Sequence, residues 1–147
     1  MLRGIDPLLG PELLQVMAAM GHGDEIAIVD ANFPAASCAR RLVRLDGVTG
    51  SAALAAILTL LPLDTFVPEP AAVMAVVGDP DAVPPPVAEF RAVLARTAGK
   101  PVPLGVLPRA EFYERARQAS AIVATGERRF YGNILVTKGV IGPEESP

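Results

Sequence analysis

The sequence predicts an α/β domain in which helices cover both faces of a mixed, largely parallel sheet. Short apolar segments rich in β-branched residues alternate along the chain with helical patterns, an order typical of parallel sheets. The last two predicted strands have no helix between them, so the sheet should be mixed. A chain of 147 residues has the length of one three-layer α/β/α domain, and we expect residues 1–147 to form it.

Elements in the first half follow from hydrophobic periodicity and from residues that start or stop helices. Apolar residues at spacings of four, four and three should share one buried helix face: Leu9, Leu13, Met17 and Met20. Helix starts are indicated by a proline, which a first turn tolerates, and by a serine, which is a good cap. The predicted elements are, in order, a helix from Pro11 to Gly21, strands over 25–29 and 43–45, and a helix from Ser51 to Pro62.

The second half is predicted on the same grounds. Its elements are, in order, a strand over 72–77, a turn over 78–81, extended prolines at 84–86, a helix that buries Val87, Phe90 and Leu94, a strand over 102–107, a helix over 108–120, and strands over 121–125 and 134–138. Pro103 suggests an edge position or an irregular start for its strand. Glu111 and Arg115 have the spacing of an i, i+4 ion pair, and residues 142–147 should form a frayed tail.

Composition limits the environment and partners of the protein. A net charge of −3 and a pI near 5.1 argue against a nucleic-acid partner. The longest apolar stretch, 52–63, is interrupted by Thr59 and Pro62 and is too short to span a membrane. A single cysteine, Cys38, and no signal-peptide pattern favour the cytoplasm. Because 51% of the residues are hydrophobic, we expect identical subunits to cover the apolar surface that remains after folding.

Several classes of chemistry lack their usual motifs in this sequence. It contains no phosphate-binding G-x-x-x-x-G-K-[ST], no G-x-G-x-x-G after a strand and no G-x-S-x-G elbow. One cysteine and one histidine do not make the usual zinc site. We therefore expect no cofactor and no metal, which leaves acid–base chemistry or plain binding.

Two polar residues near the first predicted strand are candidates for such a site. His22 lies between Gly21 and Gly23, and histidine is the natural proton carrier near neutral pH. The alternative is an ordinary turn residue or a helix cap. Asp30 directly follows the strand over 25–29, and ligands of open α/β sheets gather beyond the carboxyl ends of strands. A carboxylate there can accept hydrogen bonds from sugar hydroxyls, although a capping aspartate is also common.

Further candidates lie in the last third of the chain. Arg109 falls in the first turn of a predicted helix, where its charge opposes the helix dipole, which invites a functional explanation. Tyr113 either faces the core or points its hydroxyl into a site. Tyr131 and Asn133 offer a hydroxyl, an apolar ring and an amide. With Gly132 they also fit an ordinary tight turn that places Gly and Asn at positive φ.

Taken together, and in order from about residue 7 to about residue 140, these segments resemble the fucose-mutarotase family, which is related to the D-ribose pyranases. The resemblance is carried by residues 11–14, 20–26, 30, 32–34, 44–47, 63–64, 112–116, 125–127 and 131–135. It implies a domain somewhat like a Rossmann fold that assembles into ring-shaped oligomers, often decamers. It also implies a sugar site at the interface between subunits.

The resemblance assigns roles to residues as well. His22 matches the proton donor. The other matched positions are sugar contacts: Asp30, Asp64, Arg109, Tyr113, Tyr131, Gly132 and Asn133. Arg109 and Gly132 favour the fucose branch, because the ribose branch tends to have histidine and alanine there. We therefore expect a cytoplasmic isomerase that interconverts the α and β anomers of L-fucose. A D-ribose pyranase activity and a non-catalytic monosaccharide-binding module are the alternatives.

Overall fold

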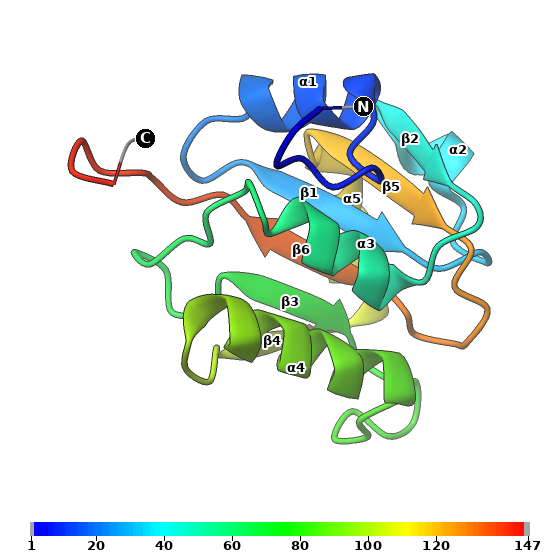
Figure 1. Cartoon of the computed structure of the whole chain (residues 1–147). Coiled ribbons are helices and arrows are strands. Elements are labelled where there is room, and N and C mark those ends of the chain that lie inside the picture. The colour runs from blue at the N-terminus through cyan, green and yellow to red at the C-terminus, as the bar shows by residue number, and fades with distance from the viewer. Residues whose placement is uncertain (1, 146–147) are drawn as a thin grey trace.

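The computed structural model describes residues 2–145, in which six strands form one sheet between two layers of helices (Figure 1). The strands are β1 (Glu25–Val29), β2 (Leu42–Leu45), β3 (Ala71–Met74), β4 (Leu104–Leu107), β5 (Ala121–Thr125) and β6 (Ile134–Thr137). Their order across the sheet is β2-β5-β1-β6-β3-β4. Only β6 runs antiparallel to its neighbours, β1 and β3, while the other paired strands are parallel. The predicted mixed, largely parallel sheet is confirmed.

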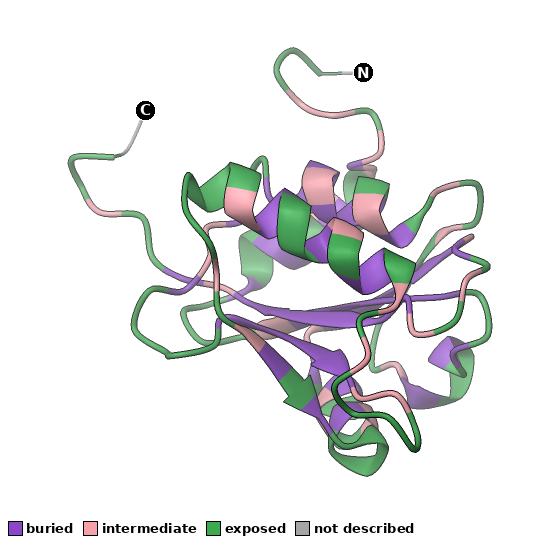
Figure 2. Cartoon of the chain, turned by 90° about the horizontal axis from the view of Figure 1, so that it is seen from below, coloured by how far each residue is buried: buried purple, intermediate pink, exposed green. Residues whose placement is uncertain are grey.

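The helices cover both faces of the sheet, as the sequence predicts. They are α1 (Pro11–Ala19), α2 (Ala35–Cys38), α3 (Gly50–Ile57), α4 (Pro85–Ala98) and α5 (Arg109–Gln118). α1, α3 and α4 pack on one face and α2 and α5 on the other, each layer with its own apolar cluster (Figure 1). β3, β5 and β6 are buried over their whole length, and Figure 2 shows the buried sheet in purple between partly exposed helices. Burial on both faces explains why these strands are continuous apolar runs rather than alternating ones.

Strand direction gives the sheet two chemically different edges. The carboxyl ends of β1 to β5 and the amino end of β6 point to one edge, which we call the carboxyl edge (Figure 1). The loop entering β1 and the chain leaving β6 lie at the opposite edge, the amino edge. β1 has five residues, so its ends are about 16 Å apart at the usual rise per residue. Side chains that flank β1 on its two sides therefore lie at different ends of the molecule.

Helix starts differ from the predicted ones where another residue supplies the cap. Thr49, not Ser51, caps α3: its hydroxyl accepts a hydrogen bond from the amide of Ala52 at 3.3 Å. Ser51 instead donates to Glu89 on α4 at 2.7 Å. α4 begins at Pro85, within the prolines that were predicted to be extended, because a first helical turn needs no amide donor at that position.

Helix ends also differ from the prediction. α1 ends at Ala19, before Gly21, because the backbone of Met20 is extended, and α3 ends at Ile57, before Pro62, because a turn follows it. α2, which has four residues, is too short for periodicity to indicate and was not predicted. No helix within residues 2–145 is long and apolar enough to cross a membrane.

β1 and β5 have the predicted bounds, other strands differ from theirs, and one ion pair is different. β3 ends at Met74 and β4 begins at Leu104, after Pro103, and the predicted edge position of β4 is confirmed. Arg115 does not pair with Glu111; its guanidinium binds the carboxylate of Glu25 at the start of β1. A residue distant in sequence but adjacent in the fold thus replaces the local partner.

The C-terminal tail is only partly described. The sequence predicts a frayed segment over 142–147, but residues 142–145 form a turn in which the amide of Glu145 donates to the carbonyl of Gly142 at 3.0 Å. Residues 146 and 147 lie outside the described part of the chain.

Candidate functional site

Five of the predicted site residues gather around one cavity of about 400 Å³ at the carboxyl edge of the sheet. They come from three segments: the residue after β1, the first turns of α5, which follows β4, and the loop before β6. These segments meet because the carboxyl ends of the parallel strands and the amino end of β6 lie at one edge. The cavity is lined by Asp30, Asn32, Phe33, Met74, Val77, Arg109, Tyr113, Phe130, Tyr131 and Asn133.

Asp30 and Asn133 form a buried, reciprocal pair at the floor of this cavity. The amide of Asp30 donates to Oδ1 of Asn133 at 2.9 Å, and Nδ2 of Asn133 donates to Oδ2 of Asp30 at 2.9 Å. Burial raises the pKa of the Asp30 carboxyl, while hydrogen bonds from the Asn32 amide and from Asn133 act in the opposite direction. The antiparallel pairing of β1 with β6 brings the two residues together, so that a polar group is held at a fixed place in an otherwise apolar interior.

An aromatic wall lies beside this pair. The ring of Tyr113 stacks on Phe33, with centroids 4.8 Å apart and planes 28° apart. The Arg109 guanidinium lies 5.4 Å from the centroid of Tyr113, so the aromatic face helps to hold a cation at the mouth of the cavity. Arg109 lies in the first turn of α5, as predicted, and is its first residue. Tyr113 therefore lines the cavity instead of filling the core.

The turn before β6 is built differently from the prediction. The residue at positive φ is Tyr131, at 62°, and neither Gly132 nor Asn133 has a positive φ. Gly132 is needed for space instead: a Cβ at this position would lie 2.6 Å from Cγ of Glu127. The Tyr131 hydroxyl accepts a hydrogen bond from the amide of Val77 at 3.2 Å, which joins this turn to the one after β3.

His22 lies at the amino edge, with a different set of partners. Its Nε2 is 3.2 Å from Oδ1 of the buried Asp64, and its ring meets the edge of Phe66 with centroids 5.3 Å apart. The amide of Phe66, and then the imidazole, lower the pKa of Asp64. The His22 side chain itself is 46% exposed, so the imidazole is accessible from solvent. Asp64, predicted as a sugar contact, is thus placed as the partner of the imidazole.

The chain leaving β6 holds both loops of this second cluster. The amide of Gly23 donates to the carbonyl of Lys138 at 2.8 Å, and the amide of Asp64 donates to the carbonyl of Thr137 at 3.1 Å. The Asp24 carboxylate accepts from the amide of Gly21 at 2.7 Å. Backbone bonds to one strand end therefore fix the position of the imidazole relative to its carboxylate.

The structure does not bring His22 to the cavity of its own chain. His22 precedes β1 and Asp30 follows it, so the length of the strand, about 16 Å, separates the two clusters. Predicted residues thus form two groups: His22 and Asp64 at the amino edge, and Asp30, Arg109, Tyr113, Tyr131 and Asn133, with Gly132 between the last two, at the carboxyl edge.

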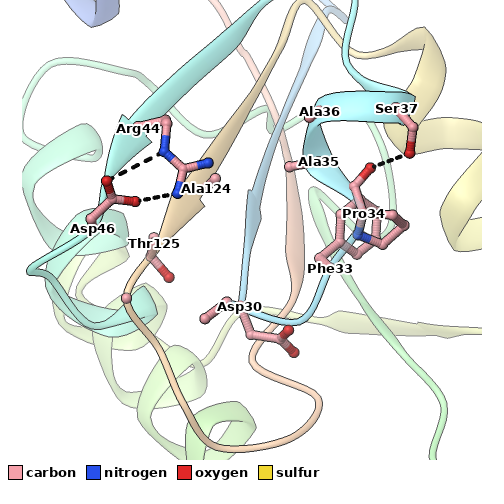
Figure 3. Close-up of a pocket in the computed structure, with 12 residues that line it drawn as sticks. Asp30, Phe33, Pro34, Ala35, Ala36, Ser37, Arg44, Asp46, Ala124 and Thr125 are labelled. Atoms are coloured by element: carbon pink, nitrogen blue, oxygen red, sulfur yellow. Dashed lines mark hydrogen bonds and ion pairs between the residues drawn. The ribbon is translucent and has the colours of Figure 1, made fainter.

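A second cavity of about 350 Å³ lies on the other side of Asp30, toward β2 and β5. Figure 3 shows its lining, in which Arg44 and Asp46 bind each other with a shortest distance of 2.6 Å. Asp30 is the only predicted site residue among the side chains that line it. The cavity that collects the predicted residues is therefore the better candidate for the site.

Replacing Asn133 with alanine should lower the free energy of unfolding by about 1–3 kcal/mol, because the buried Asp30 amide and carboxyl both lose a partner. Urea unfolding of the variant would measure this. Asn32→Ala is the matched control, since Asn32 is exposed and only its backbone amide bonds to Asp30. An equal, small effect of both changes would contradict the prediction.

Known proteins share both the sequence pattern and the fold of this chain. Residues 3–141 match the model of the family described as the RbsD / FucU transport protein family. The chain belongs to this family. The predicted resemblance is thereby confirmed over nearly the whole sequence.

Two relatives of this family member and one fold neighbour are informative. The fucose mutarotase of Homo sapiens is 49% identical over 95% of this chain and 94% of its own. A fucose mutarotase from Streptococcus pneumoniae, solved in complex with L-fucose, has a TM-score of 0.89 and 42% identity and covers 96% of this chain and 100% of its own. Bacillus subtilis RbsD complexed with D-ribose has a TM-score of 0.70, 97% coverage of this chain and 100% of its own, but 20% identity, which supports the fold alone.

Several side chains at the two clusters were not predicted as site residues. Phe33 and Met74 line the cavity, and Phe66 packs on the imidazole. Phe33 lies in the loop after β1 and Met74 ends β3. Their position at the carboxyl ends of parallel strands is a signal that could have indicated them. Phe66 carries no such signal, because its neighbour His22 is distant in sequence.

Proposed function

We propose that this family member is a fucose mutarotase, which interconverts the α and β anomers of L-fucose. The observation that carries the proposal is identity of 42–49% over nearly the full chain to proteins named fucose mutarotase, one of them solved with L-fucose. The enzyme is an isomerase, and a free monosaccharide is its ligand.

The chemistry of the cavity suits such a sugar. Asp30, Asn133 and Arg109 contribute polar groups to its lining, where they can bind hydroxyls. Phe33 and Met74 provide apolar surface, which can accept the methyl group that L-fucose carries at C6. A lining of this kind, mostly apolar with a few placed polar groups, is typical of small-molecule sites.

The complete site, in this proposal, is shared between neighbouring subunits. The amino edge of one copy, with His22, Asp64 and Phe66, docks against the carboxyl-edge cavity of the next. Both surfaces expose apolar side chains that a partner would cover: Phe66 is 70% exposed at one edge, and Phe130 is 75% exposed at the other. Contact between two different surfaces of identical chains is head-to-tail and closes into a ring when the rotation permits. The ring-shaped homo-oligomer, including a decamer of stacked rings, is part of this proposal.

The mechanism needs only proton transfer. Mutarotation opens the hemiacetal, turns the aldehyde about C1–C2 and closes the ring on its other face. Opening requires a proton for the ring oxygen and removal of the proton of the anomeric hydroxyl. His22 from one subunit delivers and recovers a proton, and Asp64 holds its imidazole by a hydrogen bond. A tyrosine hydroxyl or a water molecule serves as its counterpart.

The remaining residues orient the sugar. Asp30, Arg109, Tyr131 and Asn133 hold its other hydroxyls so that C1 and the ring oxygen meet the imidazole, with Tyr113 as the wall of the site. One positioned acid–base group contributes on the order of 10²- to 10⁴-fold in rate. Because mutarotation also proceeds in water without an enzyme, that group together with orientation is sufficient.

A cytoplasmic location completes the proposal. The only cysteine, Cys38, is buried and free, as expected for a protein of a reducing compartment. Cell fractionation with an antibody to the chain would test the location directly.

Two-dimensional exchange NMR on a panel of sugars tests the function. We expect exchange between the α and β anomers of L-fucose well above the rate in buffer. Exchange between the pyranose and furanose forms of D-ribose, without fucose exchange, would favour the pyranase. Fucose binding without any exchange above buffer would indicate a binding module, and either result would contradict the mutarotase.

A further inference from the structure

One buried acidic side chain at the carboxyl edge has no part in the mechanism above. Glu127 lies in the loop between β5 and β6, and only 3% of it is exposed. Its carboxylate is bound by Arg129, two residues later in the same loop. The amide and Nε of Arg129 donate to Oε1 at 3.0 and 2.8 Å, and Nη2 of Arg129 donates to Oε2 at 2.8 Å.

The same guanidinium ties the loop to the helical layer. Nη1 and Nη2 of Arg129 donate to the two carboxylate oxygens of Glu89 on α4, at 2.6 and 3.0 Å. The hydroxyl of Ser51 on α3 donates to Glu89 at 2.7 Å. We call Glu127, Arg129, Glu89 and Ser51 the loop clamp. The loop clamp connects the loop between β5 and β6 to α3 and α4.

Glu127 also touches the segments that carry the sugar contacts. Its carbonyl accepts a hydrogen bond from the amide of Ala31 at 2.9 Å, next to Asp30. Its Cγ occupies the space where a Cβ of residue 132 would lie, so Gly132 packs directly on it. Contacts on both sides of the cavity floor thus meet at a single residue, one through its backbone carbonyl and one through its side chain.

The clamp further explains a strained residue. Tyr131 has a φ of 62°, a region that a bulky aromatic residue adopts only when its surroundings enforce it. Arg129 and Gly132, on either side of Tyr131, are both held by Glu127. Arg129 lowers the pKa of Glu127 to about 2, so its charge is present throughout the neutral range.

We propose that Glu127 is a positioning residue for sugar binding: through the loop clamp it holds Tyr131 and Asn133 in place over Asp30. This inference rests on the proposed function, since it assigns the turn to the sugar. Glu127 touches no substrate itself. Its effect should therefore fall mainly on sugar affinity, while proton transfer by the His22 of the neighbouring subunit, which is not part of the loop clamp, is largely retained.

Glu127→Gln tests the inference, because glutamine keeps the shape and the packing on Gly132 but loses the charge that binds Arg129. We expect the KM for L-fucose in exchange NMR to rise about 10-fold with kcat changed less than about 3-fold, the pattern of lost binding that does not alter the chemical step. Titration with L-fucose, followed by chemical shifts, should give a matching rise in Kd.

Controls separate positioning from a general loss of structure. Glu114→Gln removes an exposed carboxylate that also pairs with an arginine, Arg117 on the same helix, and should leave KM unchanged. Arg129→Lys keeps the charge but not the forked geometry, and it should also raise KM. This variant tests the inference even if Glu127→Gln does not fold.

The outcomes that overturn the inference are distinct from failure of the proposed function. Unchanged KM and Kd in both clamp variants, or a fall of kcat alone, would show that Glu127 does not position the sugar contacts. Absence of fucose exchange in the unmodified protein would instead contradict the mutarotase, and the Kd comparison would then decide the role of Glu127.

Discussion

Replacing His22 with glutamine should slow fucose anomer exchange by about 10²- to 10⁴-fold, the contribution of one positioned acid–base group. Glutamine can keep a hydrogen bond to Asp64, but it does not carry a proton on and off the sugar at neutral pH. Exchange NMR at several fucose concentrations would measure the effect. Most of it should appear in kcat, because the predicted sugar contacts lie in the other cluster.

The fold of this variant should be intact, because the His22 side chain is nearly half exposed and its loop is held by backbone hydrogen bonds. Thermal unfolding should therefore change little. Glu12→Gln, an exposed change on α1, is a control for substitution on the same subunit. Undiminished exchange in a folded His22→Gln protein would remove the imidazole from the mechanism.

Mixing two inactive variants should restore activity, since we propose that each site takes His22 from one subunit and Asp30 from the next. Asp30→Asn is suited as the second variant, because it removes the charge while it keeps the size of the side chain and one of its two acceptor oxygens. In oligomers assembled from equal amounts of His22→Gln and Asp30→Asn chains, about one quarter of the interfaces should carry both native residues, if assembly is random.

Co-expression of the two variants with different affinity tags provides the sample, and tandem purification selects mixed oligomers. The expected exchange rate is about one quarter of the native rate, at least ten times above either variant alone. Each variant co-expressed with itself is the matched control. Mixed oligomers without recovered exchange would show that the two clusters do not meet across a subunit interface.

Local pattern predicted the elements of the fold because most of them bury one stripe or one run of side chains. Leu13 and Met17 of α1, and the whole of β5, are buried where the periodicity places them. The order of these elements then predicted a mixed sheet, since a strand pair without a helix between its members breaks the parallel pattern. Boundaries were less accurate, as at Ser51, because caps depend on single hydrogen bonds.

The candidate site was predicted as a set of residues but not as an arrangement. His22, Asp30 and Asn133 were selected by residue type, by position beside strands and by the family resemblance. The predicted strand over 25–29 already separates His22 from Asp30, but nothing in the spacing indicates that Asn133 lies beside Asp30, since that depends on which strands pair.

What the sequence by itself determined is therefore the strands and the helices longer than one turn, the apolar core and the chemical types available for a site, because each depends on neighbours along the chain. Only the tertiary structure decided that Asp64 binds His22, that Arg115 binds Glu25 and that Glu127 lies beneath the Tyr131 turn. These contacts join residues that the sheet order or a reversal of the chain brings together. Their energies depend on burial and on hydrogen-bond geometry, which no local pattern encodes.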